Sequence, residues 1–439
     1  MDDVLDFRGV ALSNPTSSSE DQEPAENPQK QEVEVLDSPG QTSNPWSEVL
    51  DQDASTSEIE EEPWEQELHT ATDNRVDVEN EHSSTIHVLG SGPTGKFIAH
   101  SIAALSHAPP VTLLLHTNRL MRKWNSEGRA VSVFRDGKLS AQSKIQVEFA
   151  RDDDTRAFQG GQNGPYQHTE RSNSIIKHLI VTTDGPSTLP ALSRIMHRLR
   201  SWSTILFLQD GMGIVDKVND VVFPDPRRRP NYALGNMTHK LTPTEKDFTI
   251  FERKSGGISF STLVRATHAR NEALDSDRNP LVHAVPRTEF HMEQLEKLAI
   301  NATLGPLSVL YDCPNDQLLH NYNVCQTMRL ILKETSLILQ SLPELSKAPK
   351  IQKHFSAQRL EWMMVSIIKK TGGNSTTMLQ EIKDGKRSGV EFYNGYLVRR
   401  ATELGIPCPH NEMLLAMVNA KSTIRKRRDD SYIPIRNGR

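Results

Sequence analysis

Residues 86–103 read IHVLGSGPTGKFIAHSIA, and this stretch decides the fold. A short apolar run predicts a buried strand, GSGPTG predicts a turn, and the residues after it have the apolar spacing of a helix. Its glycines have the spacing GxGxxG, in which the first permits a tight turn, the second lets the backbone approach a pyrophosphate, and the third lets helix and strand pack closely. We therefore predict a dinucleotide-binding loop, although a strand-to-helix turn that binds nothing has the same pattern. The predicted cofactor-binding residues of the loop are Gly90, Ser91, Gly92, Pro93, Thr94 and Gly95.

The second predicted strand, VTLLLH at 111–116, ends without the acidic residue that NAD-binding sites commonly place there. Arg119, Arg122 and Lys123 follow it instead, and positive charge at this point suits the 2′-phosphate of NADP. We therefore expect NADPH as the cofactor. The same side chains would also serve as ordinary solvated charges on a helix.

Further strands and helices alternate along the chain up to about residue 213. Apolar strands are predicted at 129–137, 176–183 and 203–213, with an amphipathic helix at 189–202. This alternation predicts a parallel sheet that is covered on both faces. Residues 230–261 are expected to supply the last strands of that sheet, and the polar residues 150–173 are expected to form a surface loop.

After about residue 288 the apolar residues have helical spacing. We therefore predict an α/β fold, with a Rossmann-like parallel-sheet domain over 85–285 that is followed by an all-helical domain over 286–421. Residues 422–439, which include RKRR, are predicted to be a basic tail.

The first 84 residues differ sharply in composition from the rest. They carry 23 carboxylates against three basic side chains, so their net charge is -20; because the whole chain carries -5, residues 85–439 carry +15. A segment this acidic cannot bury enough apolar surface to offset the entropy of ordering, so it is predicted to be disordered. The basic remainder suits an anionic cofactor or, alternatively, a nucleic acid.

Cysteine usage and the chain start indicate the cellular setting. Cys313, Cys325 and Cys408 have no CxxC spacing, so neither a disulfide framework nor a zinc site is predicted. No apolar run approaches the roughly 18 residues of a membrane span, so no membrane partner is expected. The acidic start MDDVLDF argues against a signal peptide and an Arg-rich transit peptide. We expect a cytoplasmic protein, with the mitochondrion as the alternative.

Several separated motifs resemble the ketopantoate (2-dehydropantoate) 2-reductase family in its fungal form. They are LFLQDGMGI at 206–214, EKLAINATLGPLSVLYDCPNDQLL at 296–319 and NSTTMLQEIKDGKRSGVEFYNGYLVRRATELGIPCP at 374–409. The resemblance implies an N-terminal Rossmann domain and a C-terminal helical domain, with NADPH and a 2-oxo acid meeting in the cleft between them. It also implies hydride transfer to the ketone carbon while a lysine protonates the oxygen.

The resemblance assigns roles to individual residues. Lys297 matches the catalytic lysine, whose ammonium can stabilise and protonate the developing alkoxide. Asn301 matches a substrate-binding asparagine, and a spacing of four places it on the same helix face as Lys297. Asn315 matches another polar substrate contact. Thr377 stands where the family usually has a serine that binds substrate.

Four positions depart from the family pattern. Asp184 replaces a lysine near the nicotinamide, and Asp210, which we also expect to bind the cofactor, replaces the asparagine of a QNGxG turn. Gly305 replaces a second asparagine, and Gly389 replaces the active-site glutamate. These departures leave two functions open. The chain is either an NADPH-dependent reductase of a 2-oxo acid, or a catalytically inactive scaffold that binds protein or RNA. A homodimer is compatible with both.

Overall fold

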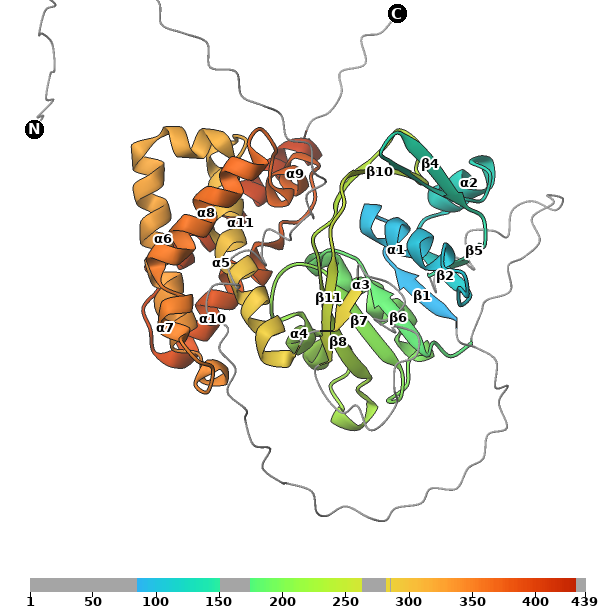
Figure 1. Cartoon of the computed structure of the whole chain (residues 1–439), viewed down its shortest axis with the longest axis horizontal. Helices are drawn as coiled ribbons and strands as arrows, with labels where there is room; N and C mark the ends of the chain where they lie inside the picture. Colours follow the sequence, from blue (N-terminus) through green and yellow to red (C-terminus); the bar gives the residue numbers. More distant parts are fainter. Residues whose placement is uncertain (1–84, 151–173, 263–281, 285, 432–439) are drawn as a thin grey trace, which may run out of the picture.

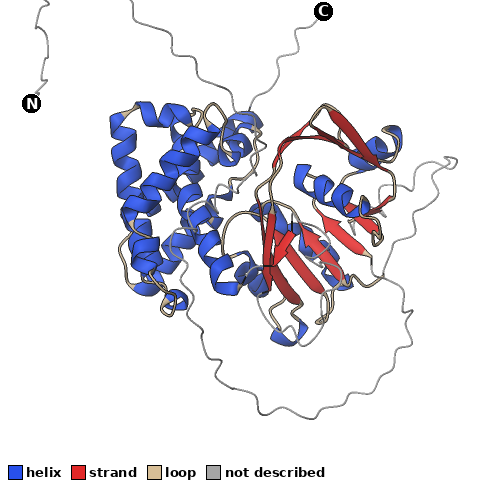
Figure 2. Cartoon of the chain, viewed as in Figure 1, coloured by secondary structure: helices blue, strands red, loops and turns tan. Residues whose placement is uncertain are grey.

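The computed structural model describes residues 85–150, 174–262, 282–284 and 286–431, which form two domains lying side by side (Figures 1 and 2). One domain is built on β-sheets and the other is entirely helical. The predicted disordered segment 1–84, nearly all of the predicted loop 150–173 and the end of the predicted tail lie outside the described residues.

The main sheet has eight strands in the order β12-β11-β8-β7-β6-β1-β2-β5. Strand β1 pairs in parallel with β2 on one side and with β6 on the other, and β11 pairs antiparallel with β8. The strands are β1 (Ile86–Leu89), β2 (Val111–Leu115), β5 (Ile145–Phe149), β6 (His178–Val181), β7 (Thr204–Leu208), β8 (Asn231–Met237), β11 (Ile258–Thr262) and β12 (Val282–Ala284).

Helices cover both faces of this sheet, as predicted for a Rossmann-like domain. Because successive side chains of a strand point to opposite faces, Val88 joins the core cluster under α1 while Leu89 joins the cluster under α3 and α4. The covering helices are α1 (Pro93–Ala103), α2 (Asn118–Ser126), α3 (Gly185–Ile195) and α4 (Ile214–Val221).

A second, four-stranded sheet corrects the prediction that all strands up to residue 261 belong to one sheet. Its order is β4-β3-β10-β9, and it packs against α1. The strands are β3 (Val131–Arg135), β4 (Lys138–Gln142), β9 (Lys240–Pro243) and β10 (Thr249–Lys254). Apolar periodicity identifies a strand but not its partner. The sequence nevertheless contains a local signal for the hairpin of β3 and β4, the pair Asp136-Gly137. Both residues have positive φ in the structure, as a two-residue hairpin turn requires.

The helical domain confirms the predicted change to helical spacing after about residue 288. Its helices are α5 (Arg287–Tyr311), α6 (Tyr322–Gln340), α7 (Ile351–His354), α8 (Ala357–Thr371), α9 (Thr377–Lys383), α10 (Asn394–Leu404) and α11 (Pro409–Ser431). Helix α11 runs past the predicted boundary at residue 421, so the first part of the expected basic tail is helical. Residues 422–431 contain neither glycine nor proline, and nothing in them stops the helix.

Proline inside α5 is compensated by a buried asparagine. Pro306 has no N–H to donate to the carbonyl of Ala302, four residues earlier. Asn394 is fully buried, and its Nδ2 donates to that carbonyl at 2.8 Å and to Asn411 Oδ1 at 3.1 Å. This contact ties α5, which carries Lys297, to α10 and α11.

Phe392 joins the two domains. It ends the short 3₁₀ helix η7 (Gly389–Phe392), yet its ring belongs to an apolar cluster of the sheet domain. A Cβ added at Gly185 would stand 2.4 Å from this ring, and one at Gly211 would stand 2.8 Å from Phe392 Cβ. The backbone N–H of Met212 also donates to Phe392 O at 2.8 Å. Phe392 therefore contacts the sheet domain where two glycines leave room for it.

Phe392→Ala is expected to lower the free energy of unfolding by about 3–5 kcal/mol, because it leaves a cavity between the two domains. Urea denaturation followed by circular dichroism measures this. Tyr322→Ala is the matched control, because Tyr322 is 71% exposed. Equal stabilities of the two variants would contradict the role of Phe392 at the interface.

Candidate functional site

The glycine loop lies between β1 and α1, as predicted. Gly90 has φ +126°, and a Cβ there would stand 2.4 Å from Thr182 Oγ1. A Cβ at Gly95 would stand 1.8 Å from the carbonyl oxygen of Gly90. At Gly92, by contrast, an added Cβ would meet no atom of the described residues within 4 Å. Gly90 and Gly95 are therefore required by packing, whereas Gly92 faces open space.

The loop stands at the topological switch point of the main sheet. The chain passes from β1 to β2 on one side and later returns to β6 on the other side of β1. Ligands of open α/β sheets bind in the crevice outside the carboxyl ends of the strands at such a point. The remaining predicted loop residues, Ser91, Pro93 and Thr94, are half-buried here. Helix α1 begins without a side-chain cap, which leaves its first N–H groups for a ligand.

Lys297 extends from α5 to this edge of the sheet. Its Nζ donates to Asp210 Oδ1 at 2.8 Å, and Asp210 stands in the loop that follows β7. The Lys297 side chain is 14% exposed and that of Asp210 is 51% exposed. The structure thus brings two predicted site residues together in an ion pair between the domains and leaves the carboxylate half exposed.

The other predicted site residues lie in the helical domain. Asn301 follows Lys297 by about one turn of α5 and is half-buried. Thr377 is the exposed first residue of α9, which packs against α5. Asn315 is buried, and its Nδ2 donates to Thr371 Oγ1 at 2.9 Å. Asn301 therefore stays beside Lys297, whereas Nδ2 of Asn315 is hydrogen-bonded inside the helical domain.

Asp184 has a local structural role at the carboxyl end of β6. Its Oδ1 accepts the backbone N–H of Ser187 at 2.8 Å, so it caps the N-terminus of α3. A lysine, which has no acceptor, could not do this. The aspartate that replaces the family lysine is therefore explained in part by the start of this helix.

The two glycines that replace family residues are closely surrounded. A Cβ at Gly305 would stand 3.0 Å from Met378 Cε, so Met378 of α9 takes the space next to α5. A Cβ at Gly389 would stand 3.4 Å from Tyr393 Cε2 and 3.8 Å from Glu381 Oε2. Each glycine leaves room that another side chain fills.

Glu381 and Tyr393 lie beside Gly389, and no motif of the sequence singles them out. The backbone N–H of Gly389 donates to Glu381 Oε2 at 3.1 Å. Burial raises the pKa of Glu381 to about 7; this N–H opposes the shift and the charge of Asp184 adds to it. Burial, together with Asp210 and Glu381, raises the pKa of Tyr393 well above its usual value. No sequence signal places Glu381 opposite position 389, because only the tertiary fold brings α9 and η7 together.

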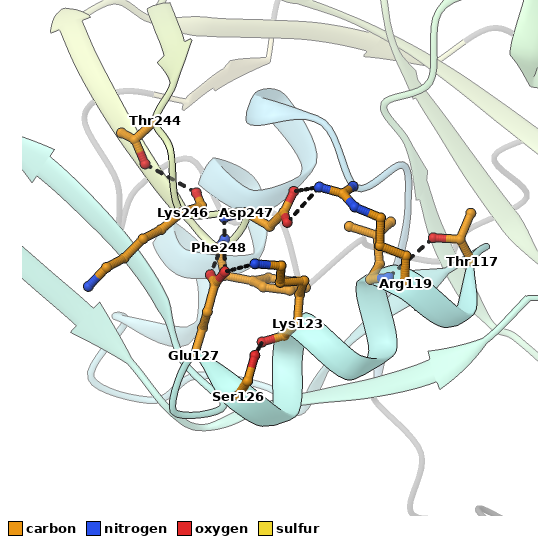
Figure 3. A network of polar contacts seen from close by, with 10 residues as sticks. Thr117, Arg119, Lys123, Ser126, Glu127, Thr244, Lys246, Asp247 and Phe248 are labelled. Carbon is orange, nitrogen blue, oxygen red and sulfur yellow. Dashed lines mark hydrogen bonds and ion pairs between the residues drawn. The ribbon is translucent and has the colours of Figure 1, made fainter. Parts of the chain in front are cut away.

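The basic side chains expected at the cofactor phosphate are partly engaged (Figure 3). Arg119 donates to both carboxylate oxygens of Asp247, at 3.2 and 3.0 Å, and Lys123 Nζ lies 4.0 Å from Glu127 Oε1. Glu127 also accepts the backbone N–H of Asp247 at 3.3 Å. Arg122 is exposed and has no ion pair among the described residues. These hydrogen bonds attach the turn between β9 and β10 to α2. The exposed guanidinium of Arg122 is accessible to a ligand.

The described part of the chain offers no candidate for a metal-ligand group or for a membrane-spanning helix. No three His, Cys, Asp or Glu side chains in it gather as ligands for a metal ion. None of its helices is both long enough and apolar enough to span a membrane.

Comparison with known proteins accounts for both domains. Residues 86–263 match the family model described as ketopantoate reductase PanE/ApbA, and residues 289–422 match the model of its C-terminal part. A probable 2-dehydropantoate 2-reductase of Schizosaccharomyces pombe is 25% identical over 353 residues, which cover 77% of this chain and 97% of the relative. A ketoisovalerate reductase of Beauveria bassiana is 20% identical over 385 residues, which cover 76% and 82%.

A solved structure shares the fold. It is a ternary structure of D-mandelate dehydrogenase with NADH and anilino(oxo)acetate; it superposes with a TM-score of 0.60 at 16% identity and covers 78% of this chain and 99% of its own. Together with the glycine loop and the position of Lys297, these matches show that the chain belongs to the ketopantoate reductase family, whose members similar to it are oxo acid reductases.

Proposed function

We propose that the protein is an NADPH-dependent reductase of a 2-oxo acid. The observation that carries this proposal is the Lys297 ammonium, which α5 holds beside the loop after β7 at the ligand-binding edge of the sheet. A catalytic acid must reach the crevice in which the cofactor would bind. Lys297 meets that requirement.

The glycine loop fits a dinucleotide. Gly92 offers open space where a pyrophosphate would approach, and the uncapped N-terminus of α1 presents N–H groups and a positive dipole end to it. When bound, the reduced nicotinamide supplies the hydride that reduces the ketone carbon. The protein's own residues bind the cofactor, and they stabilise the negative charge that develops on the substrate oxygen.

Lys297 is the proposed proton donor. Its ammonium can stabilise the negative charge on the substrate oxygen and then deliver a proton to it. Asp210 holds this side chain at the sheet edge in the absence of substrate, at 2.8 Å. A substrate carboxylate or alkoxide would compete with Asp210 for the ammonium. Asn301, about one turn further on α5, would supply an amide to orient the substrate.

The proposed substrates are 2-oxo acids with a short branched side chain. The two curated relatives are named for the reduction of 2-dehydropantoate and of ketoisovalerate. In this chain Met378, which packs next to Gly305, is buried in an apolar cluster of the helical domain with Leu379 and Val390, so the names of the two relatives carry the choice of substrate class.

The test is NADPH oxidation by the purified full chain, followed by absorbance across a panel of 2-oxo acids that differ in branching. Turnover of at least one branched acid is expected. No turnover of any acid by folded protein at high concentration would favour the other candidate, a catalytically inactive scaffold for protein or RNA. That candidate is favoured by the Lys297–Asp210 pair, which engages the proton donor, and by the negative charge of Asp184.

We also propose a cytoplasmic homodimer. Light scattering of the purified chain and fractionation of cells test the two parts of this proposal separately.

Asp247→Asn is expected to raise the preference for NADPH over NADH several-fold, because it releases the Arg119 guanidinium near the expected position of the 2′-phosphate. The ratio of kcat/KM with the two cofactors measures this preference. Glu245→Gln is the matched control, since Glu245 is an exposed carboxylate of the same turn. An equal rise in both variants would show that only net charge matters, and no rise would place the phosphate away from Arg119.

A further inference from the structure

The space that a side chain at position 389 would enter is occupied by a carboxyl group from another helix. The Cβ direction of Gly389 points toward Glu381 Oε2, at 3.8 Å, and toward the ring of Tyr393, at 3.4 Å. The N–H of Gly389 donates to the same Glu381 oxygen at 3.1 Å. The backbone of η7 thus holds the Glu381 carboxyl group. Because residue 389 has no side chain, this carboxyl group can lie close to η7.

The surroundings of Glu381 favour its neutral form. It is half-buried, and the carboxylate of Asp184 on the sheet domain lies near enough to disfavour a second negative charge. Lys386, in the segment between α9 and η7, acts in the opposite direction, as does the Gly389 N–H. Burial outweighs both, so the pKa of Glu381 rises from 4.5 to about 7.

Tyr393 lies beside Gly389, as Glu381 does, and it is within electrostatic reach of Asp210. The charges of Asp210 and Glu381 both act on the Tyr393 phenol and, with burial, raise its pKa. Asp210 in turn is paired with Lys297 at 2.8 Å. The preceding residue, Phe392, is inserted into the sheet domain. Glu381 therefore belongs to the helical domain and is within electrostatic reach of Asp184, which follows β6 on the sheet domain.

We propose that Glu381 is a further substrate-binding residue of the reductase site, whose carboxyl group in its protonated form donates a hydrogen bond to the carboxylate of the bound 2-oxo acid. This inference rests on the proposed function. An anion can approach a crevice that already contains Asp184 and Asp210 more easily when the third carboxyl group is neutral. An O–H donor to a carboxylate then makes a strong, charge-assisted hydrogen bond.

The experiment measures KM for the best 2-oxo acid against pH in the full chain and in four variants. In the wild type, KM is expected to rise about tenfold between about pH 6 and about pH 8, because only the protonated form of Glu381 binds and its fraction falls about tenfold across a pKa near 7. Glu381→Gln keeps a neutral donor, so its KM should stay low and independent of pH. Glu381→Ala should raise KM about tenfold at the lower pH, since it removes one hydrogen bond to a charged group.

Two further variants make the assignment specific. The double variant Glu381→Ala/Gly389→Glu returns a carboxyl group to the same space from the other side, and it should recover the pH dependence of KM that Glu381→Ala has lost. Glu361→Gln is the matched control: Glu361 pairs with Arg329 at 2.7 Å on the exposed side of the helical domain, so this variant should behave as the wild type.

The outcomes separate this inference from the proposed function. An active wild type whose KM does not depend on pH, or a Glu381→Gln variant with unchanged pH dependence, would overturn the role of Glu381 and leave the reductase intact. A wild type that reduces no 2-oxo acid, although it binds the reduced cofactor by fluorescence titration, would overturn both.

Discussion

Lys297→Ala is expected to lower kcat for the reduction of a 2-oxo acid by about 100-fold or more. A positioned general acid typically accelerates a reaction by about 10²- to 10⁴-fold. The ammonium is the cation that α5 holds at the carboxyl end of β7. Steady-state kinetics with NADPH and the best acid of the panel measure the effect. The Kd for the cofactor should change little, since the glycine loop that binds it is untouched.

Lys333→Ala is the matched control, because Lys333 is an exposed lysine on α6 of the same domain. A Lys297→Ala variant that retains the activity of this control would exclude Lys297 as the proton donor. Asp210→Asn should instead lower KM, since it frees the ammonium and removes a negative charge from the path of an anionic substrate. Asp210 is half exposed, so solvent and salt screen the effect and a several-fold change is expected.

Gly95→Ala is expected to destabilise the protein by about 3 kcal/mol or more and to abolish cofactor binding. The added Cβ would stand 1.8 Å from Gly90 O and 2.7 Å from Thr182 Oγ1, and the nearer of these atoms belongs to the backbone. Helix α1 would have to move away from β1, and the N–H groups at its start would move with it. Thermal denaturation and a fluorescence titration with reduced cofactor measure the two effects.

Gly92→Ala separates binding from folding. Gly92 has φ -72°, which alanine adopts without strain, and its Cβ would face open space. The melting temperature should therefore stay close to that of the wild type. The methyl group would project to where the pyrophosphate must approach the backbone, so the Kd for NADPH should rise about tenfold or more. An unchanged Kd in this variant would mean that the loop does not bind the dinucleotide.

Short-range patterns predicted most of the fold correctly. The glycine spacing located the junction of β1 and α1, because the whole pattern lies in the contiguous stretch 90–95, even though the atoms that crowd Gly90 belong to the distant Thr182. The change to helical periodicity located the second domain for the same reason. The division of the strands between two sheets was predicted wrongly, because β3 pairs with β10, which lies more than a hundred residues later in the chain. No local pattern encodes that partner.

The candidate site also has features that motifs in the sequence indicate and features that depend on tertiary packing. The glycine loop was predicted from its spacing, and the resemblance to the family pointed to Lys297 and to the departures at Asp184, Asp210, Gly305 and Gly389, because each of these residues belongs to a contiguous motif. Only the tertiary structure showed that Asp210 pairs with Lys297 and that Met378 and Glu381 fill the space beside the two glycines. A missing side chain is visible in a sequence, but what occupies its space depends on how distant segments pack.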